Sequence, residues 1–206
     1  MAQLQLGEGQ QALERLAAMS LPPSGVAARV AVHEHWARCM TSLGAEAWAA
    51  GPDAAAAWPR ITLLGPHHGA PLLAHCDARG WQDTGLPAFR TIDDVTRFIR
   101  DSLGHSDGVH LALLDRRRGL IGMGGLQPDE SDSTIYYWVA PEYRGRGHGH
   151  RLVHGLLRWA RTHGRLHLRA SVQRTNEASR RVVLAAGFTR ESVSGETEIY
   201  RRECER

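Results

Sequence analysis

Residues 136–150 read YYWVAPEYRGRGHGH, and this stretch decides how the rest of the chain is interpreted. Its aromatic and β-branched start is typical of a strand. Gly145, Gly147 and Gly149 then alternate with Arg146 and His148. The residues that follow, 150–163, carry apolar side chains at helical spacing before a glycine. We therefore predict a strand, a glycine-rich loop and an amphipathic helix in direct succession.

A loop of this kind can bind a phosphate group. Glycine lacks the Cβ that would keep a ligand away from the backbone, and the first turn of a helix has N–H groups without an intrahelical acceptor. The helix dipole favours an anion at the same place. Arg144, Arg146 and Arg151 add cationic donors. The loop lacks the Gly-Lys-Ser/Thr ending of a P-loop, and its strand does not open a βαβ unit, which argues against P-loop and dinucleotide-binding folds.

Strands and helices alternate along the chain from about residue 58. Hydrophobic spacing and turn residues predict strands at residues 60–64, 109–115, 120–125, 133–140, 165–172, 188–192 and 197–202. They predict helices at residues 70–78, 92–103, 150–163 and 177–186, with Thr91 capping the second and Asn176 or Thr175 capping the last. Residues 1–57 are interpreted as an alanine-rich helical extension, which leaves residues 58–206 as the main domain.

The composition is that of an ordinary globular protein, with 42% hydrophobic and 23% charged residues. No stretch approaches the roughly 20 apolar residues of a membrane span, and Met1–Gln10 lacks an apolar signal segment, so we expect a cytoplasmic protein. Cys39, Cys76 and Cys204 are too scattered for a disulfide framework. From residue 141 onward 14 arginines face 7 glutamates, which suits a phosphate-bearing ligand.

Two motifs resemble the GNAT superfamily of acyltransferases. Residues Arg144–Gly149 match its R/Q-x-x-G-x-G/A signature. The longer stretch Tyr137–Gly149 resembles the Rim-type branch, whose members acetylate the N-terminal residue of ribosomal proteins. A second block of the superfamily is present as Asn176–Ser179 followed by Ala186–Phe188. The resemblance covers about residues 58–206.

The resemblance implies an α/β (α+β) fold of the GNAT type. Its central mixed, mostly antiparallel sheet is expected to splay apart between the fourth and fifth strands, here residues 133–140 and 165–172, with helices on its faces. Acetyl-CoA, as co-substrate, would enter that gap and lie along the backbone of the fourth strand. The residues expected to bind it are Trp138, Val139, Arg144, Gly145, Arg146, Gly147, His148, Gly149, His150 and Asn176.

The implied reaction is direct attack of a neutral primary amine on the thioester, the amine belonging to a protein N-terminus, a peptide or a small molecule. A backbone N–H on the fourth strand, assigned here to Tyr137, would stabilise the tetrahedral oxyanion. The leaving thiolate needs a proton, and Ser179 occupies the position of a serine given that role in the Rim-type branch. An equally good interpretation is that Ser179 only bonds its own helix backbone.

Two positions depart from the family's pattern. Val183 stands where many relatives carry a tyrosine that protonates the thiolate, and Thr134 stands where the branch often carries a glutamate. The general base is therefore left open between Glu130, Asp132, Tyr136, a histidine acting through water, and proximity alone.

Other functions remain as alternatives at this stage. The departures allow a non-catalytic acyl-CoA-binding sensor, which would bind the coenzyme without releasing its thiol. The basic C-terminal third allows nucleic-acid binding, but few aromatic residues accompany the arginines, so we rank it last. The 12 histidines include pairs such as His33/His35 and His67/His68 but no third ligand at metal spacing, and we expect no metal site. A homodimer is left open, and no membrane partner is expected.

Overall fold

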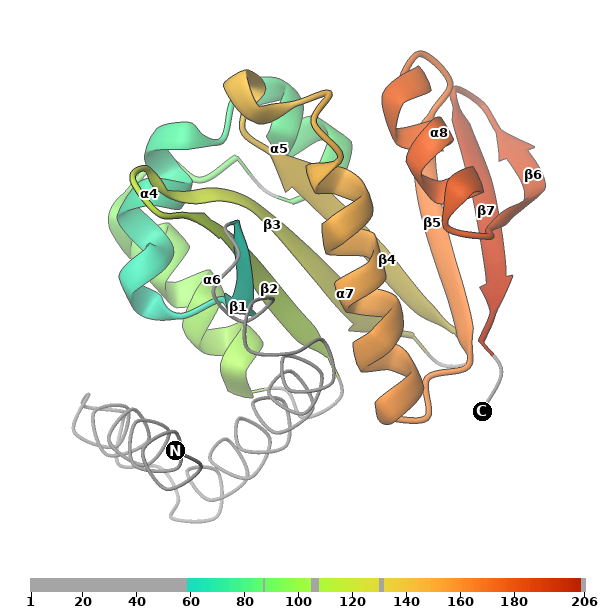
Figure 1. Ribbon diagram of the computed structural model, residues 1–206, viewed down its shortest axis with the longest axis horizontal. Helices are drawn as coiled ribbons and strands as arrows, with labels where there is room; N and C mark the ends of the chain where they lie inside the picture. The colour runs from blue at the N-terminus through green and yellow to red at the C-terminus, as the bar shows by residue number, and fades with distance from the viewer. Residues whose placement is uncertain (1–58, 87, 105–107, 130–131, 205–206) are drawn as a thin grey trace.

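The computed structural model describes residues 59–86, 88–104, 108–129 and 132–204 (Figure 1). The strands are β1 (Arg60–Leu63), β2 (Val109–Asp115), β3 (Gly119–Pro128), β4 (Ser133–Val139), β5 (His167–Gln173), β6 (Thr189–Ser194) and β7 (Thr197–Glu203). The helices are α4 (Gly69–His75), α5 (Ala78–Thr84), α6 (Ile92–Gly104), α7 (His148–Thr162) and α8 (Glu177–Ala185), with 3-10 turns η1 (Pro66–His68) and η2 (Pro141–Tyr143). The helical extension expected at residues 1–57 lies outside the described residues, as does Glu130.

The strands form one seven-stranded sheet in the order β1-β2-β3-β4-β5-β7-β6. Every neighbouring pair is antiparallel except β4 and β5, which are parallel. The β4–β5 pairing runs only from Ser133 opposite Leu168 to Ile135 opposite Ala170. Beyond these residues the two strands diverge, so that β5, β7, β6 and α8 stand apart from the other half of the sheet (Figure 1). The expected mixed, mostly antiparallel sheet that splays between its fourth and fifth strands is confirmed.

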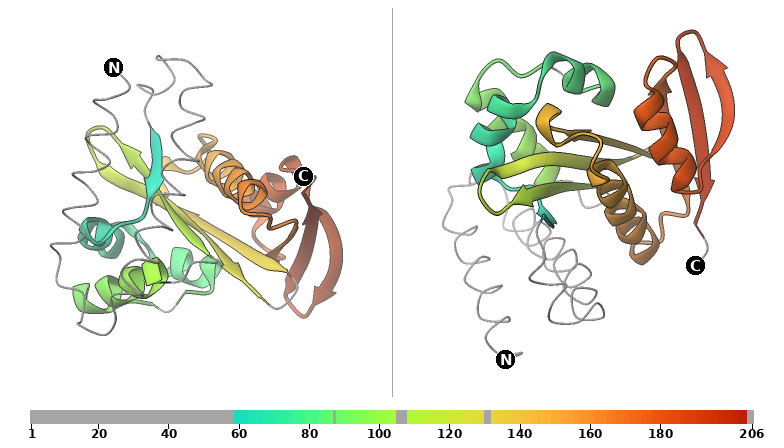
Figure 2. Two further views of the ribbon diagram at one scale, coloured as in Figure 1. Left: turned by 90° about the horizontal axis from the view of Figure 1, so that it is seen from below. Right: turned by 45° about the horizontal axis from the view of Figure 1, so that its top comes forward.

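Helices cover both faces of the sheet. One face carries α7 and α8, and the other carries α4, α5 and α6 (Figure 2). Side chains of β4 alternate between the two cores, so that Val139 and the partly buried Tyr137 pack on the α7 side while Tyr136 and Trp138 pack on the side of α4 and α5. Consecutive residues of this one strand therefore touch helices from opposite layers.

Capping side chains set the helix starts as the sequence predicts. At α6 the Asp94 N–H donates to Thr91 Oγ1 at 3.2 Å, and the Thr91 N–H donates to Asp94 Oδ2 at 3.0 Å. At α8 the Ser179 N–H donates to Asn176 Oδ1 at 3.0 Å. Asn176, and not Thr175, is thus the cap of α8.

Two elements differ from the prediction. The helix expected at residues 70–78 is α4, which ends already at His75, and an additional helix, α5, begins at Ala78, where the Asp77 carboxylate accepts a bond from the Gly80 N–H at 2.9 Å. The helix α7 begins at His148, two residues before the predicted start, so Gly149 lies in its first turn. None of the helices in the described part of the chain is long and apolar enough to cross a bilayer.

Candidate functional site

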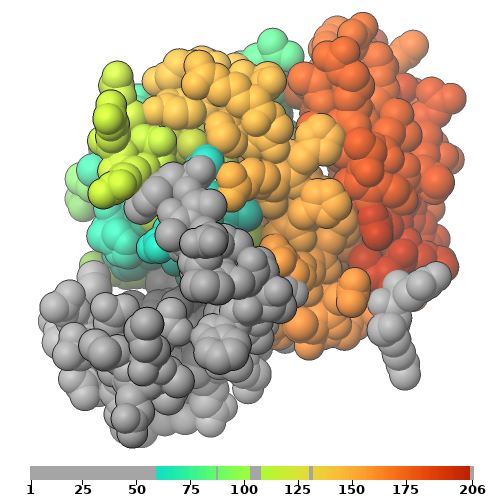
Figure 3. Space-filling model, in the orientation of Figure 1, coloured from blue at the N-terminus to red at the C-terminus, as the bar shows by residue number. Residues whose placement is uncertain are grey.

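A cavity of about 450 Å³ opens where β4 and β5 separate, and we call it the split-sheet cavity. In the space-filling view the yellow-to-orange and the red parts of the molecule meet along a seam (Figure 3). The cavity is lined by β4, the glycine loop, the start of α7, the middle of β5, and parts of α5 and α8. It brings together nearly all the residues that the sequence nominates: Tyr137, Trp138, Val139, Arg144, Gly145, Gly147, His148, Gly149, His150, Asn176 and Ser179. Arg146 is the nominated residue that does not line it.

The edge of β4 offers unused backbone groups to this cavity. In an antiparallel ladder, successive residues point their N–H and C=O groups to alternate sides. The Ala140 N–H donates to Ile121 O of β3 at 2.8 Å. By alternation, the N–H groups of Tyr137 and Val139 point away from β3, toward the side where β5 has diverged. No strand of the described sheet pairs with them past Ile135.

The start of α7 provides a second set of unused donors. The first helical bond runs from the Arg151 N–H to Gly147 O at 3.2 Å, so the N–H groups of His148, Gly149 and His150 have no acceptor within the helix. Gly147, the N-cap, has a φ of 79°, which favours glycine strongly. These first-turn residues line the cavity, and the helix dipole adds a positive potential there. The arrangement suits an anion such as a diphosphate.

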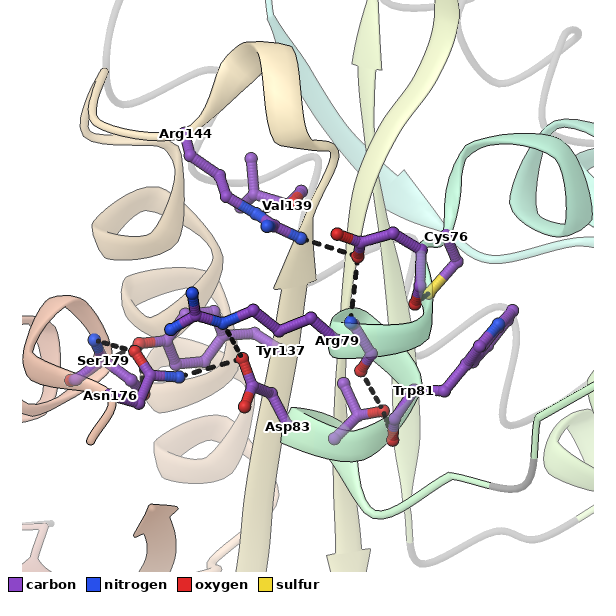
Figure 4. Close-up of polar contacts among 12 residues, drawn as sticks. Cys76, Arg79, Trp81, Asp83, Tyr137, Val139, Arg144, Asn176 and Ser179 are labelled. Atoms are coloured by element: carbon purple, nitrogen blue, oxygen red, sulfur yellow. Dashed lines mark hydrogen bonds and ion pairs between the residues drawn. The ribbon is translucent and has the colours of Figure 1, made fainter. Parts of the chain in front are cut away.

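The arginines near the loop have different roles. Arg144 donates from Nε to Val139 O at 2.9 Å and from a terminal nitrogen to Asp77 Oδ1 at 2.7 Å, which fastens the loop to β4 and to α5 (Figure 4). Arg146 lies over the ring of Tyr143, 5.7 Å from its centroid. The Arg151 guanidinium donates to a backbone carbonyl near β1. Of the three, Arg144 is the one whose side chain lines the cavity.

The surroundings of the His148 imidazole disfavour its charged form. Its pKa lies below the ordinary value of 6.5, first because of burial and then because of the nearby Arg151 and Arg146 guanidinium groups. A neutral ring can still donate one N–H to an anion.

A hydroxyl pair lies inside the cavity, between β4 and α8. Tyr137 Oη and Ser179 Oγ are 2.9 Å apart (Figure 4). Burial raises the pKa of Tyr137 to about 12, against the lowering effect of the bond to Ser179, so the phenol stays protonated at neutral pH. The sequence nominated Tyr137 for its backbone N–H alone. In the structure the Tyr137 side chain also takes part in the site. Its phenol contacts α8, the helix in which Val183 stands where many relatives carry a tyrosine.

The residues that the sequence offered as general bases differ in whether they reach the cavity. Asp132 precedes the closed end of the β4–β5 pairing, where its Oδ2 forms an ion pair with Arg169 Nε at 2.9 Å, and it does not line the cavity. Thr134, which stands where the Rim-type branch often carries a glutamate, is paired with Arg169 at that same closed end. Tyr136 lines the cavity, but its hydroxyl is hydrogen-bonded to His110 and burial raises its pKa. None of these gives the cavity an ionised carboxylate.

A carboxylate that the sequence did not single out lines the cavity instead. Asp83, on α5, accepts a hydrogen bond at Oδ2 from Asn176 Nδ2 at 3.0 Å and faces Arg79 Nε at 3.4 Å (Figure 4). No motif marks it, because α5 was not predicted beyond residue 78. Among the described residues there is no group of three His, Cys, Asp or Glu side chains arranged to hold a metal ion.

The free strand edge and the glycine-rich helix N-terminus in one cavity suit an extended ligand that carries a diphosphate. The comparison with family models is specific: the acetyltransferase (GNAT) domain matches residues 60–189. The chain belongs to the GNAT acetyltransferase family. A search of curated protein sequences found no significant match.

Solved structures share the fold at low sequence identity. An acetyltransferase of the GNAT family from Streptococcus pneumoniae is similar with a TM-score of 0.61 and 17% identity, over 71% of this chain and 99% of that one. A phosphinothricin acetyltransferase from Sinorhizobium meliloti, solved with acetyl-CoA, gives 0.61 and 14%, over 70% and 88%. A ribosomal-protein-S5-alanine acetyltransferase from Vibrio fischeri gives 0.59 and 16%, over 69% and 91%.

Proposed function

We propose that this protein transfers an acetyl group from acetyl-CoA to a primary amine, with the split-sheet cavity as its active site. The observation that carries the proposal is the meeting of two sets of free backbone donors in one cavity. The first turn of α7 suits the diphosphate of the coenzyme, and the free Val139 N–H on the edge of β4 suits an amide carbonyl of its pantetheine arm. A ligand bound to both would bring its thioester toward Tyr137 and Ser179.

The groups around that point can support acyl transfer. Attack by a neutral amine gives a tetrahedral oxyanion and a positively charged nitrogen, and the free Tyr137 N–H can donate to that oxyanion. When the carbon–sulfur bond breaks, the thiolate takes a proton. The Tyr137 phenol can give its own proton to sulfur while it regains one, directly or through Ser179, from the nitrogen. Because burial raises the phenol's pKa to about 12, the group returns to its protonated state after each turnover.

The acceptor that we favour is the α-amine of a protein or peptide N-terminus. Support comes from the Rim-type resemblance of Tyr137–Gly149 and from the shared fold with acetyltransferases named for ribosomal proteins. A terminal α-amine has a pKa of about 8, so a sizeable fraction is neutral at physiological pH, whereas a lysine-like amine with a pKa of about 10 is almost wholly protonated. The cytoplasmic location and the alternative of a homodimer stay predictions from the sequence.

The test is release of free coenzyme thiol from acetyl-CoA with a panel of amines: alanine- and serine-starting peptides, the same peptides with blocked N-termini, and polyamines. The proposal expects thiol release with at least one free amine and none with the blocked peptides, together with the mass of an acetyl group on the product. Tight binding of acetyl-CoA without turnover across the panel would instead indicate the coenzyme-binding sensor.

A further inference from the structure

The split-sheet cavity has one carboxylate among its described lining residues. Apart from Asp83, the charged or titratable groups that line it are basic or phenolic, and they include Arg79, Arg144 and Arg181. The Asp83 side chain is 24% exposed, so it is accessible from the cavity but partly shielded from bulk water. An anionic group in such a place costs desolvation energy and is therefore expected to have a partner or a task.

The carboxylate is held from both sides of the split. It comes from α5, on one face of the sheet, and Asn176 from the start of α8 donates to its Oδ2 across a separation of 93 residues (Figure 4). Arg79 approaches the same oxygen at 3.4 Å, and the arginine side chain is 58% exposed. No described protein group is hydrogen-bonded to the other oxygen, Oδ1. One oxygen is thus fixed in position while the second is available to a ligand.

A short chain of bonds joins this carboxylate to the hydroxyl pair. Asn176 donates to Asp83 with its amide nitrogen and accepts from the Ser179 N–H with its amide oxygen at 3.0 Å. Ser179 Oγ is in turn 2.9 Å from Tyr137 Oη. The raised pKa of Tyr137 comes first from burial, and the negative charge of Asp83 adds to it, which places the two groups in electrostatic contact. Asp83 therefore lies beside the point where the thioester is proposed to bind.

We propose that Asp83 binds the acceptor amine as an ammonium ion and accepts its proton, which makes it the general base of this protein. The inference rests on the proposed acetyl transfer. An ammonium group would bind at Oδ1, the oxygen that neither Asn176 nor Arg79 contacts. When the ligands fill the cavity and displace its water, the lower dielectric favours the neutral amine and carboxylic acid over the ion pair.

The protons balance over the reaction. One N–H bond of the ammonium breaks as an O–H bond forms on Asp83, and the neutral amine attacks the thioester carbon. The nitrogen, now positively charged, loses a second proton, which passes through the Tyr137 and Ser179 hydroxyls to the thiolate. The proton on Asp83 leaves to water with the products. Asp132 cannot take this part, because its carboxylate is paired with Arg169 at the closed end of the split.

The decisive variant is Asp83→Asn, because asparagine keeps the shape of the side chain and can still accept the bond from Asn176. Its matched control is Asp93→Asn, which removes the same charge from an exposed position on α6. We expect Asp83→Asn to lower kcat/KM for an amine of pKa near 10 by about 100-fold at pH 7.5, while calorimetry gives an acetyl-CoA Kd within about twofold of the original. Asp93→Asn should change neither quantity.

Two further readouts separate proton transfer from a structural role. With an acceptor whose amine pKa lies below the assay pH, no proton must be removed before the attack, so the defect of Asp83→Asn should shrink to a few-fold. With the acceptor of pKa near 10, the rate of the variant should rise about tenfold for each pH unit between 7 and 9, following the neutral fraction of the amine. The charged or titratable groups facing Asp83 are Arg79 from α5 and Tyr137 from β4, and the pKa of Tyr137 lies above this range.

The outcomes distinguish the two proposals. If the unaltered protein acetylates no amine, the proposed function fails and the role of Asp83 fails with it. If the unaltered protein is active and Asp83→Asn has the same kcat/KM and pH profile, the acetyl transfer stands and Asp83 is not its base. An equal loss of activity for amines of high and low pKa would likewise overturn the proton-transfer role.

Discussion

The contact between α5 and β4 should be sensitive to a single methyl group at Gly80. A Cβ built at this position would lie 2.2 Å from Trp138 Cδ1 and 2.8 Å from Cys76 Sγ, whereas ordinary contacts begin near 3.4 Å. Trp138 is only 3% exposed and Cys76 is 9% exposed, so neither side chain can simply swing away. The Gly80→Ala variant must therefore move α5 away from β4 by about an ångström.

Two opposing effects set the size of the change in stability. Overpacking a buried contact costs about 1–3 kcal/mol, and replacing glycine by alanine within a helix recovers up to about 1 kcal/mol. We expect the free energy of unfolding to fall by about 1–2 kcal/mol. The same movement would displace Asp77, which holds Arg144, and Asp83, so acetyl-CoA affinity and acceptor KM should both worsen.

Urea unfolding followed by tryptophan fluorescence measures the first effect, and calorimetric titration with acetyl-CoA measures the second. Gln82→Ala, at an exposed position of the same helix, is the control and should leave both quantities close to those of the original protein. If Gly80→Ala is as stable as the original protein or more so, α5 does not pack against Trp138 as described here.

Two more substitutions test the hydroxyl pair and a buried histidine. Tyr137→Phe keeps the ring but removes the hydroxyl 2.9 Å from Ser179, and we expect kcat to fall by about 100-fold with acetyl-CoA affinity within about twofold; an unchanged kcat would exclude the relay. Burial and then the neighbouring His67 lower the pKa of His68 from 6.5 to about 4, and its Nδ1 accepts from the Gly65 N–H. Because the unfolded chain binds this proton first, the free energy of unfolding should fall as the pH drops from 6.5 toward 4, by about 2 kcal/mol between pH 7 and 5. Urea unfolding at both pH values should show that loss in the original protein and a much smaller one in His68→Asn; equal losses in the two proteins would contradict the assignment.

Most of the sheet and the long helices could be predicted from the sequence because each has a local signal. Alternating apolar residues mark β5, and capping residues mark the starts of α6 and α8. The helix α5 has a capping residue, Asp77, but no apolar stripe to support it, since Gly80 and Trp81 are its only buried residues. Its position depends on the fit between Gly80 and the Trp138 ring, which only the folded chain reveals.

The candidate site likewise has one part that the sequence predicts and another that it does not. The glycine loop could be located from sequence because the backbone donors and the motif belong to one continuous segment. Asp83 could not, because it reaches the cavity through the packing of α5, and its partner Asn176 is 93 residues away in sequence. Asp132 is the opposite case, a residue that the sequence suggests and the structure excludes. Its nearness to β4 in sequence suggested a base, but its carboxylate lies at the end where β4 and β5 are still paired.

The central claim is that the first-turn N–H groups of α7 bind the diphosphate of acetyl-CoA, and one calorimetric comparison tests it. Gly147 and Gly164 lie at the two ends of α7 with φ values of 79° and 68°, and a Cβ at either would meet nothing within 4 Å. Valine strains the backbone in both places, so both variants should lose stability to a similar degree. We predict that Gly147→Val weakens acetyl-CoA binding at least tenfold while Gly164→Val leaves it unchanged. Absence of acetyl-CoA binding by the original protein, or equal affinity in Gly147→Val and Gly164→Val, would contradict the account.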